Sequence, residues 1–228
     1  MAKQGWPRLI LYKNPASPPS CAVMILGDIL GLTFDYKEPE LRKREHKSAE
    51  FKKINPMGTI PVLQDDDFIV SESHAIMKYL LNKYGGALQE KLYPSEPRQQ
   101  AKVDQCLFFE AGVLFPRLKA VALPSFFHGL AGPTSQHLED IEEAYSVVEA
   151  YLNGDRYIAG DRITIADLSL GTTISAAEAI LELDKKKYPL SVAWLSRLQE
   201  EDCFKEINNP GAALFTKLLH MSWQKNKN

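Results

Sequence analysis

The sequence has no apolar run approaching the roughly 20 residues that a bilayer-spanning helix needs. It also has no strong excess of charge, because 27 lysine and arginine residues oppose 29 aspartate and glutamate residues, for a formal net charge of −2. A nearly neutral surface gives no electrostatic reason for nucleic acid or an anionic membrane to be the main partner. We therefore expect a protein that binds neither nucleic acid nor a membrane.

Cysteine is scarce as well. The three cysteines, Cys21, Cys106 and Cys203, are odd in number and far apart in the sequence, which argues against a disulfide framework and against a zinc cluster. Residues 1–7 contain no apolar stretch of the kind found in a secretory signal. We expect a cytoplasmic protein that holds no metal.

The first part of the chain alternates strand and helix signals. A short apolar run, Leu9–Tyr12, is followed by a proline-rich turn, which predicts a buried strand. Two apolar runs separated by Asp65-Asp66-Asp67 predict a hairpin. The predicted elements, in chain order, are a strand at 9–12, a helix at about 20–30, a strand at 32–36, the hairpin at 62–70 and a helix at 73–84. This order predicts an α/β domain over residues 1–88.

Beyond a proline-bearing linker at 92–97 only helical spacing of apolar residues is found. The segment from Thr164 to about Leu183 is largely apolar, which predicts a helix in the middle of a bundle. We therefore predict an all-α domain over residues 89–228.

The first residues with chemical potential follow the first strand. Ser17 precedes Pro18 at the expected start of a helix, where backbone N–H groups and the helix dipole attract anions. A hydroxyl group there can donate to a bound thiolate or phosphate, or it can simply cap the helix. Cys21, one turn further on, has no second cysteine nearby, so we interpret it as a packing residue.

Two further segments carry weaker signals. Pro61 enters a predicted strand, where a cis peptide bond would leave the backbone of Ile60 free to pair with an extended ligand; alternatively, Pro61 only marks an edge strand. Glu72-Ser73-His74 lies where a strand meets a helix. Ser73 is a natural N-cap, and Glu72 beside hydroxyl and N–H donors would also suit the zwitterionic end of an amino acid.

In this order and spacing the three segments resemble the amino-terminal domain of cytosolic glutathione transferases, most closely the insect delta and epsilon classes. The resemblance extends over about residues 8–223. Its pieces are Ser17-Pro18-Pro19, Asn55 to Pro61, Glu72 to Ile76, Glu45-His46 with Glu50-Phe51, Leu92-Tyr93-Pro94, Phe109 to Phe115 and Ile163 to Leu168.

The resemblance implies a thioredoxin-like α/β amino-terminal domain, an all-α carboxy-terminal domain and a homodimer. Glutathione would be the co-substrate, lying along the first domain, and Ser17 would be the catalytic residue that donates to its sulfur. The residues that would bind the rest of glutathione are His46, Thr59, Ile60, Glu72, Ser73 and His74. A capping box from Thr164 to Asp167 would serve folding.

The second substrate would be a hydrophobic electrophile held against the helical domain. Our candidates for its pocket are Phe115, Leu118 and Lys119, although an apolar stripe at helical spacing is also typical of a core. The segment 124–133 looks like a loop that overhangs this pocket, with Phe126 and Phe127 either anchoring a ligand or packing.

Three departures from the family pattern stand out. Ser20-Cys21 replaces the usual Cys-Arg, which removes a cation, and Gly58 replaces a histidine that would donate to glutathione. Pro116 should bend the helix that walls the pocket, which suggests an unusual class. The leading hypothesis is an enzyme that conjugates glutathione. The first alternative is a glutathione-binding carrier of hydrophobic ligands with little turnover, and a cysteine-dependent reductase is disfavoured because Ser17 occupies the position after the strand.

Overall fold

The computed structural model describes residues 8–227. The stretch 1–7, to which the expectation about a secretory signal refers, lies outside them, as does residue 228. Within the described part, the first domain contains a four-stranded sheet in the order β2-β1-β3-β4. The strands are β1 (Leu9–Tyr12), β2 (Phe34–Lys37), β3 (Val62–Asp65) and β4 (Phe68–Ser71). β1 pairs parallel with β2 and antiparallel with β3, so the sheet is mixed.

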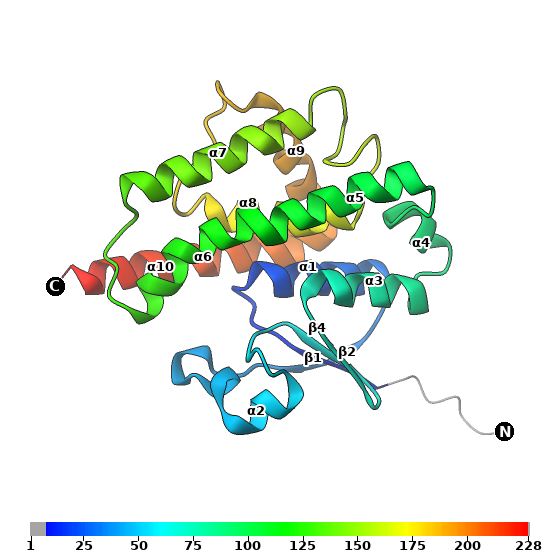
Figure 1. The fold of residues 1–228 in the computed structure, drawn as a ribbon, viewed down its shortest axis with the longest axis horizontal. Helices are drawn as coiled ribbons and strands as arrows, with labels where there is room; N and C mark the ends of the chain where they lie inside the picture. The colour runs from blue at the N-terminus through cyan, green and yellow to red at the C-terminus, as the bar shows by residue number, and fades with distance from the viewer. Residues whose placement is uncertain (1–7, 228) are drawn as a thin grey trace.

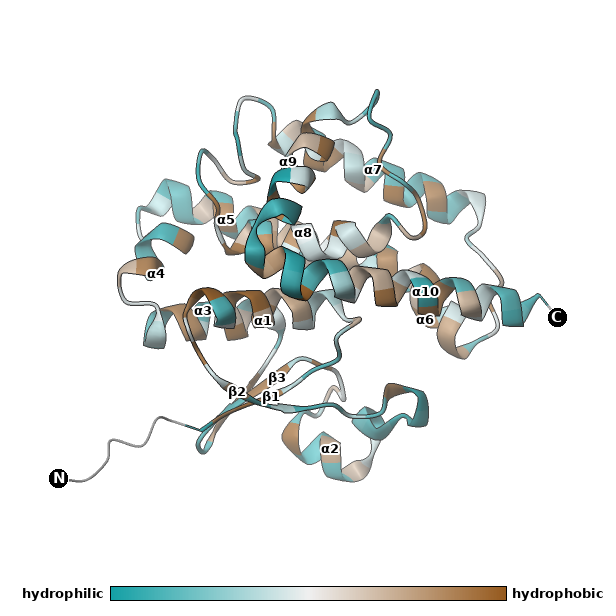
Figure 2. Cartoon of the chain, turned by 180° about the vertical axis from the view of Figure 1, so that it is seen from behind, coloured by the Kyte–Doolittle hydropathy of each residue, from teal (hydrophilic) through white to brown (hydrophobic). Residues whose placement is uncertain are grey.

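Helices cover both faces of this sheet. Figure 1 shows α1 (Pro18–Ile29) and α3 (Ser73–Tyr84) between the sheet and the helical domain, and α2 (Ala49–Ile54) on the opposite side. Two short 3-10 helices, η1 (Leu41–Lys43) and η2 (Glu45–Lys47), precede α2. In Figure 2 the brown, hydrophobic colour runs through the strands and along much of α1 and α3, and it recurs on the helices of the second domain. The predicted α/β domain is confirmed.

The rest of the chain is helical, as predicted. Its elements are α4 (Ala87–Leu92), α5 (Pro97–Phe109), η3 (Glu110–Leu114), α6 (Phe115–Phe127), α7 (Ser135–Tyr151), α8 (Ile165–Ala177), α9 (Pro189–Glu200), η4 (Phe204–Asn208) and α10 (Asn209–Asn226). Every residue of α8 is buried, which confirms its central position, although the helix ends at Ala177 and not near Leu183. The predicted division between residues 88 and 89 falls inside α4.

The helical run that contains Pro116 has a π-helical turn shortly before this proline. A proline inside a helix removes one backbone hydrogen bond and crowds the carbonyl group four residues earlier. η3, which ends two residues before the proline, is a π-helix, so its wider turn accommodates the ring where an α-turn would be interrupted. α5, η3 and α6 therefore form one long helical run (Figure 1).

The two domains share one hydrophobic core. α1 packs along α8, and buried residues of both domains belong to the same cluster. Close approach is needed where α10 begins, because a Cβ atom at Gly211 would lie 2.5 Å from the carbonyl oxygen of Pro15 and 2.9 Å from the sulfur of Cys21. The start of α10 therefore lies directly against the turn that leads into α1.

Candidate active site

Strand register brings the predicted site segments to one end of the sheet. Tyr12, Val62 and Ser71 lie in one row across β1, β3 and β4. The chain that leaves β1, the chain that enters β3 and the chain that leaves β4 therefore meet at this end. These are the segments that carry Ser17, Thr59-Ile60 and Glu72-Ser73.

The turn before α1 is held by its own side chains. The backbone N–H of Ser17 donates to the carbonyl oxygen of Asn14 at 3.0 Å. The hydroxyl oxygen of Ser20 accepts from the N–H of Asn14 at 3.4 Å, and the thiol of Cys21 donates to the carbonyl oxygen of Pro15 at 3.2 Å. Ser20 and Cys21, which depart from the family pattern, thus hold the turn in place.

Ser17 is the N-cap of α1, but its side chain forms no capping hydrogen bond. Pro18 occupies the first helical position, as predicted, and has no N–H to donate. The hydroxyl group is half-buried and lines a cavity of about 870 Å³. The interpretation that Ser17 only caps the helix is therefore not supported, and its hydroxyl is free to meet a ligand.

Cys21 is not placed to act as a nucleophile. Its side chain is 2% exposed. Burial raises the pKa of the thiol to about 12, even though the charge of Lys13 opposes this effect. At neutral pH the thiol stays protonated, which argues against a reductase that uses this cysteine.

The segment before β3 contains the predicted cis peptide bond, between Ile60 and Pro61. Asn55 shapes the approach to it, because its side-chain amide donates to the carbonyl oxygen of Thr59 at 2.9 Å and to the hydroxyl oxygen of Thr59 at 3.0 Å. Asn55 is 2% exposed, whereas Thr59 and Ile60 are half-buried. The expected bend is therefore present, and its two candidate residues remain partly accessible.

The start of α3 differs from the prediction. Ser73 was expected to be the N-cap, but it is the first helical residue, and Glu72 is the N-cap with φ 70° and ψ 114°. A positive φ at a residue other than glycine is uncommon, and such strain collects at functional sites. Glu72 is exposed, and within residues 8–227 its carboxylate forms no ion pair and its side chain does not cap the helix.

His74 points into the boundary between the domains. Its Nε2 atom lies 2.7 Å from the hydroxyl oxygen of Ser169 and 3.1 Å from a carboxylate oxygen of Glu110. The other carboxylate oxygen of Glu110 accepts from Thr173 at 2.6 Å. Sequence reasoning missed these three partners, because nothing local in the sequence links α3 to η3 and α8.

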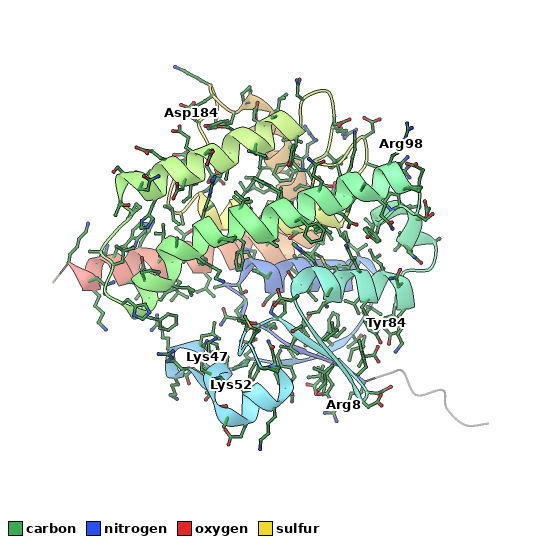
Figure 3. All side chains as sticks on the ribbon, viewed as in Figure 1. Arg8, Lys47, Lys52, Tyr84, Arg98 and Asp184 are labelled. Carbon is green, nitrogen blue, oxygen red and sulfur yellow. The ribbon has the colours of Figure 1, made fainter. Side chains whose placement is uncertain are left out.

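His46 lies in η2 and carries an unused polar atom. Its Nδ1 is buried and has no hydrogen-bond partner among residues 8–227. Burial, with the charges of Lys47 and Arg44, lowers the pKa of the imidazole, so the ring is neutral at neutral pH. Buried polar atoms in proteins rarely lack a hydrogen-bond partner, and a bound ligand would supply one for this Nδ1 atom. Figure 3 shows Lys47 on the side of this segment that faces the helical domain.

The structure gives a backbone reason for Gly58. Its φ is 59°, and a Cβ atom there would lie 2.6 Å from the carbonyl oxygen of His46. A histidine at this position would therefore be strained and crowded. The glycine at this position, which departs from the family pattern, therefore suits the backbone conformation between α2 and β3.

The cavity of about 870 Å³ brings Ser17 together with all three pocket candidates, Phe115, Leu118 and Lys119. The cavity does not include His46, Thr59, Ile60, Glu72, Ser73 or His74. Much of its other wall comes from α10, which the sequence did not assign to the pocket: Phe215, Leu218, Met221, Ser222, Lys225 and Asn226.

The predicted overhanging loop is shorter than expected. Pro124 to Phe127 belong to α6, and the irregular chain begins at His128. Pro124 lies in the last turn, where few backbone hydrogen bonds remain to be lost. Phe126 and Phe127 nevertheless line the cavity, and Phe126 also packs edge-on against Phe215 with ring centroids 6.0 Å apart.

Residues 8–227 contain neither a metal-binding cluster nor a membrane-spanning helix. No group of three or more histidine, cysteine, aspartate or glutamate residues in this range is arranged to hold a metal ion. Nor does any helix of this range combine the length and the apolar character required to span a bilayer.

Comparison with known proteins identifies the family. Residues 7–82 match the model of the glutathione S-transferase N-terminal domain, and residues 117–202 match that of the C-terminal domain. Glutathione S-transferase 1 of Manduca sexta is 38% identical over 213 residues, covering 92% of this chain and 97% of that protein. Glutathione S-transferase D7 of Anopheles gambiae is 34% identical over 213 residues, covering 92% and 96%.

Solved structures agree with these matches. An epsilon-class glutathione S-transferase from the housefly Musca domestica superposes with a TM-score of 0.91 at 38% identity, covering 94% of this chain and 98% of that one. A Drosophila mojavensis homologue, solved with bound glutathione, gives 0.91 at 38% identity, covering 95% and 98%. The resemblance to the insect classes and the thioredoxin-like domain are thereby confirmed. The chain belongs to the glutathione transferase family of enzymes.

Proposed function

We propose that this chain conjugates glutathione to hydrophobic electrophiles, and that Ser17 activates the thiol. One observation carries the proposal: the hydroxyl group of Ser17 stands at the amino end of α1 without a capping partner and lines the large cavity. The Drosophila mojavensis homologue with bound glutathione supports the choice of co-substrate. Detoxification of foreign compounds in the cytoplasm is the role that we propose for this activity.

The chemistry follows from the position of this hydroxyl. A free thiol has a pKa of about 8.5, so only a few per cent is thiolate at neutral pH. A hydroxyl donor and a helix amino terminus both stabilise the anion and lower that pKa. The sulfur lone pair then forms a bond to the electrophilic carbon, and the leaving group departs with its bonding electrons. The rate gain comes from thiolate supply and from proximity.

We propose that the first domain, residues 1–88, holds glutathione along the end of the sheet. Glu72 and Ser73 would bind the amino and carboxylate groups of the γ-glutamyl part, and Thr59 and the backbone of Ile60 the middle and glycyl parts. The free carboxylate of Glu72 and the half-buried backbone beside Pro61 support this assignment. His46, whose Nδ1 lacks a partner, would bind near the glycine end.

His74 has a different place in the proposal. Its Nε2 is engaged by Ser169 and Glu110 of the helical domain, so only Nδ1 remains to contact glutathione. The same contacts fix the first turn of α3 against α8, which would hold Ser73 in register with the ligand.

We propose that the second domain, residues 89–228, provides the hydrophobic substrate pocket. Phe115, Leu118 and Lys119 would line it on α6. The volume of about 870 Å³ supports the proposal, because small-molecule sites are concave, largely apolar and of a few hundred to about 1,000 Å³.

A homodimer is also proposed. Phe108 on α5 is 73% exposed, and Phe68 and Ile69 on the edge strand β4 are 46% and 40% exposed. Exposed apolar side chains of this size are typical of interaction surfaces. Lys78 and Asp104 tie α3 to α5 at 2.6 Å, which gives this side of the molecule a fixed shape. A monomer in sedimentation equilibrium would contradict the proposal.

The carrier alternative rested on Gly58 and on the Ser20-Cys21 pair. Both departures have structural reasons, since Gly58 avoids the carbonyl oxygen of His46 and the pair holds the turn before α1. No feature of the described residues favours the carrier over the enzyme.

The test is Ser17→Ala with a chloronitroaromatic substrate. We expect kcat/KM to fall by about 100-fold, the usual cost of removing one donor to a developing or stabilised anion, while retention on immobilised glutathione persists. Thr134→Ala, at the capped start of α7, is the matched control and should keep full activity. Equal activity of Ser17→Ala and the parent would remove Ser17 from the mechanism, and retention of the parent without turnover would favour the carrier.

A further inference from the structure

The cavity extends along α10, so the spacing of residues on this helix indicates how long the cavity is. Gly211, in the first turn of the helix, lies against the turn that carries Ser17, and Lys225, in its last turn, lines the cavity. Lys225 is fourteen steps along the helix from Gly211, and at 1.5 Å per residue the two positions lie roughly 21 Å apart. A ligand whose reacting atom lies beside Ser17 therefore has a path about 20 Å long toward Lys225.

The outer part of this path is an apolar ledge. Leu123 and Phe127 on α6 and Met221 on α10 all line the cavity and are 43%, 39% and 50% exposed. Large apolar side chains left in water at the rim of a cavity are typical of a surface that a ligand covers. A compact substrate held near Ser17 would leave this ledge bare, so the ledge indicates an elongated one.

The charges that line the cavity are not balanced. The two acidic residues, Glu38 and Glu40, are paired with Lys13 at 2.5 Å and with Lys43 at 2.8 Å. The three basic residues that line the cavity have no ion pair and no side-chain hydrogen bond with any residue of the described range. They are Arg42, Lys119 and Lys225. The charge left unpaired in the cavity is therefore positive.

Lys225 is held on an ordered turn. The indole N–H of Trp223 donates to the hydroxyl oxygen of Ser125 at 2.7 Å. The side-chain amide of Asn226 donates to the carbonyl oxygens of Ser125 and Leu130, both at 2.9 Å. These bonds fix the last turn of α10 to the end of α6 on both sides of Lys225, so the backbone that carries this exposed lysine is held at the cavity.

We propose that the second substrate is an elongated amphipathic electrophile with an anionic head group, such as an α,β-unsaturated ketone on a long chain that ends in a carboxylate. The inference rests on the proposed function of the site. The carboxylate pairs with Lys225, the chain covers the apolar ledge, and Arg42 and Lys119 add positive potential. The thiolate adds to the β-carbon, the C=C electrons move to the carbonyl oxygen, and the α-carbon of the enolate then takes a proton from water.

The test compares a long-chain enone that carries a terminal carboxylate with its methyl ester. In the parent we expect KM for the acid to be about two- to fivefold below that for the ester, the range that ion pairs with an exposed lysine give. Lys225→Gln should remove this preference by raising KM for the acid to that for the ester, because the head group loses its ion pair. Lys227→Gln, two residues on and outside the cavity lining, is the matched control. Added salt should raise KM for the acid only.

A second readout does not depend on turnover. Binding of oleate and of oleyl alcohol, measured by displacement of a fluorescent apolar dye, should favour oleate in the parent and Lys227→Gln but not in Lys225→Gln. Equal binding of the two probes by the parent, or equal KM for acid and ester, would overturn the inference. Turnover of the chloronitroaromatic in that case would leave the proposed function intact, whereas a preference for oleate without any turnover would support the anionic ligand and reject the transferase.

Discussion

Among the helices of residues 8–227 that have a serine or threonine as N-cap, α1 and α8 use it in opposite ways. Ser17 at the start of α1 forms no capping hydrogen bond and opens onto a cavity. Thr164 at the start of α8 is 3% exposed. Its hydroxyl and N–H donate to the carboxylate of Asp167 at 3.1 and 2.8 Å. The same residue type is therefore structural where its partners lie within the fold and available for chemistry where they do not.

The surroundings explain the difference. Asp167 is fully buried, and besides Thr164 it accepts from the N–H of Ile158 at 2.9 Å and from the indole N–H of Trp194 at 2.8 Å. Two prolines at the start of α1 leave no N–H for Ser17 to accept from in the first two helical positions. The capping residues at the start of α8 find their hydrogen-bond partners within the protein, whereas the hydroxyl group of Ser17 at the start of α1 forms no capping hydrogen bond.

The largest expected effect comes from Asp167→Ala. The substitution leaves the N–H groups of Ile158, Thr164 and Trp194 buried without an acceptor, and we expect the free energy of unfolding to fall by about 3–5 kcal/mol. Urea unfolding followed by circular dichroism measures it. Asp161→Ala, at an exposed acid of the same loop, should change stability by less than about 0.5 kcal/mol. If the two variants unfold at the same urea concentration, the hydrogen bonds of Asp167 at the start of α8 do not stabilise the fold.

A smaller difference in the free energy of unfolding is expected between substitutions of the two N-cap residues, Thr164 and Ser17. Thr164→Ala removes a buried hydroxyl that donates to Asp167, and we expect a loss of about 1–2 kcal/mol in the free energy of unfolding. Ser17→Ala removes a hydroxyl with no partner in the fold, and we expect a change below about 0.5 kcal/mol. Equal losses in urea unfolding would mean that Ser17 also stabilises its helix, and the contrast would break down.

The smallest effect is a shift in thiol reactivity. Ser17→Cys introduces a thiol at an open helix start, and we expect its pKa to lie below the usual value of about 8.5. Burial raises the pKa of both Cys21 and Cys106 to about 12, so neither should react near neutral pH. The rate of iodoacetamide labelling is measured as a function of pH for the variant and for the parent. The difference between the two curves gives the pKa of the introduced thiol. A midpoint above 8.5 would mean that the start of α1 does not stabilise a thiolate.

Much of the fold was predictable because its signals are local. The strand at Leu9–Tyr12, the hairpin and the buried helix after Thr164 all follow from short runs of apolar residues and their boundaries. The errors came where long-range packing overrides local preference. Glu72 displaces Ser73 as N-cap, and α6 continues through Pro124 to Phe127. The helical run also continues past Pro116, with a π-helical turn before it.

The candidate site was predictable in part for the same reason. Ser17 and the residues of α6 reach one cavity as expected, because each lies in a segment with its own sequence signal. The contribution of α10 and the contacts of His74 with Glu110 and Ser169 join residues far apart in the chain. Apolar spacing shows that such helices have a buried face, but it does not show which cavity that face borders.

The anchoring of Asn226 to Ser125 and Leu130 has a practical consequence for anyone who makes this protein. The last turn of α10 lines the cavity, so a purification tag inserted directly after this helix would emerge beside the cavity and compete with whatever enters. Arg8, where the described chain begins, lies at the far end of the sheet (Figure 3). A removable tag at the amino end is therefore the safer choice for kinetic work.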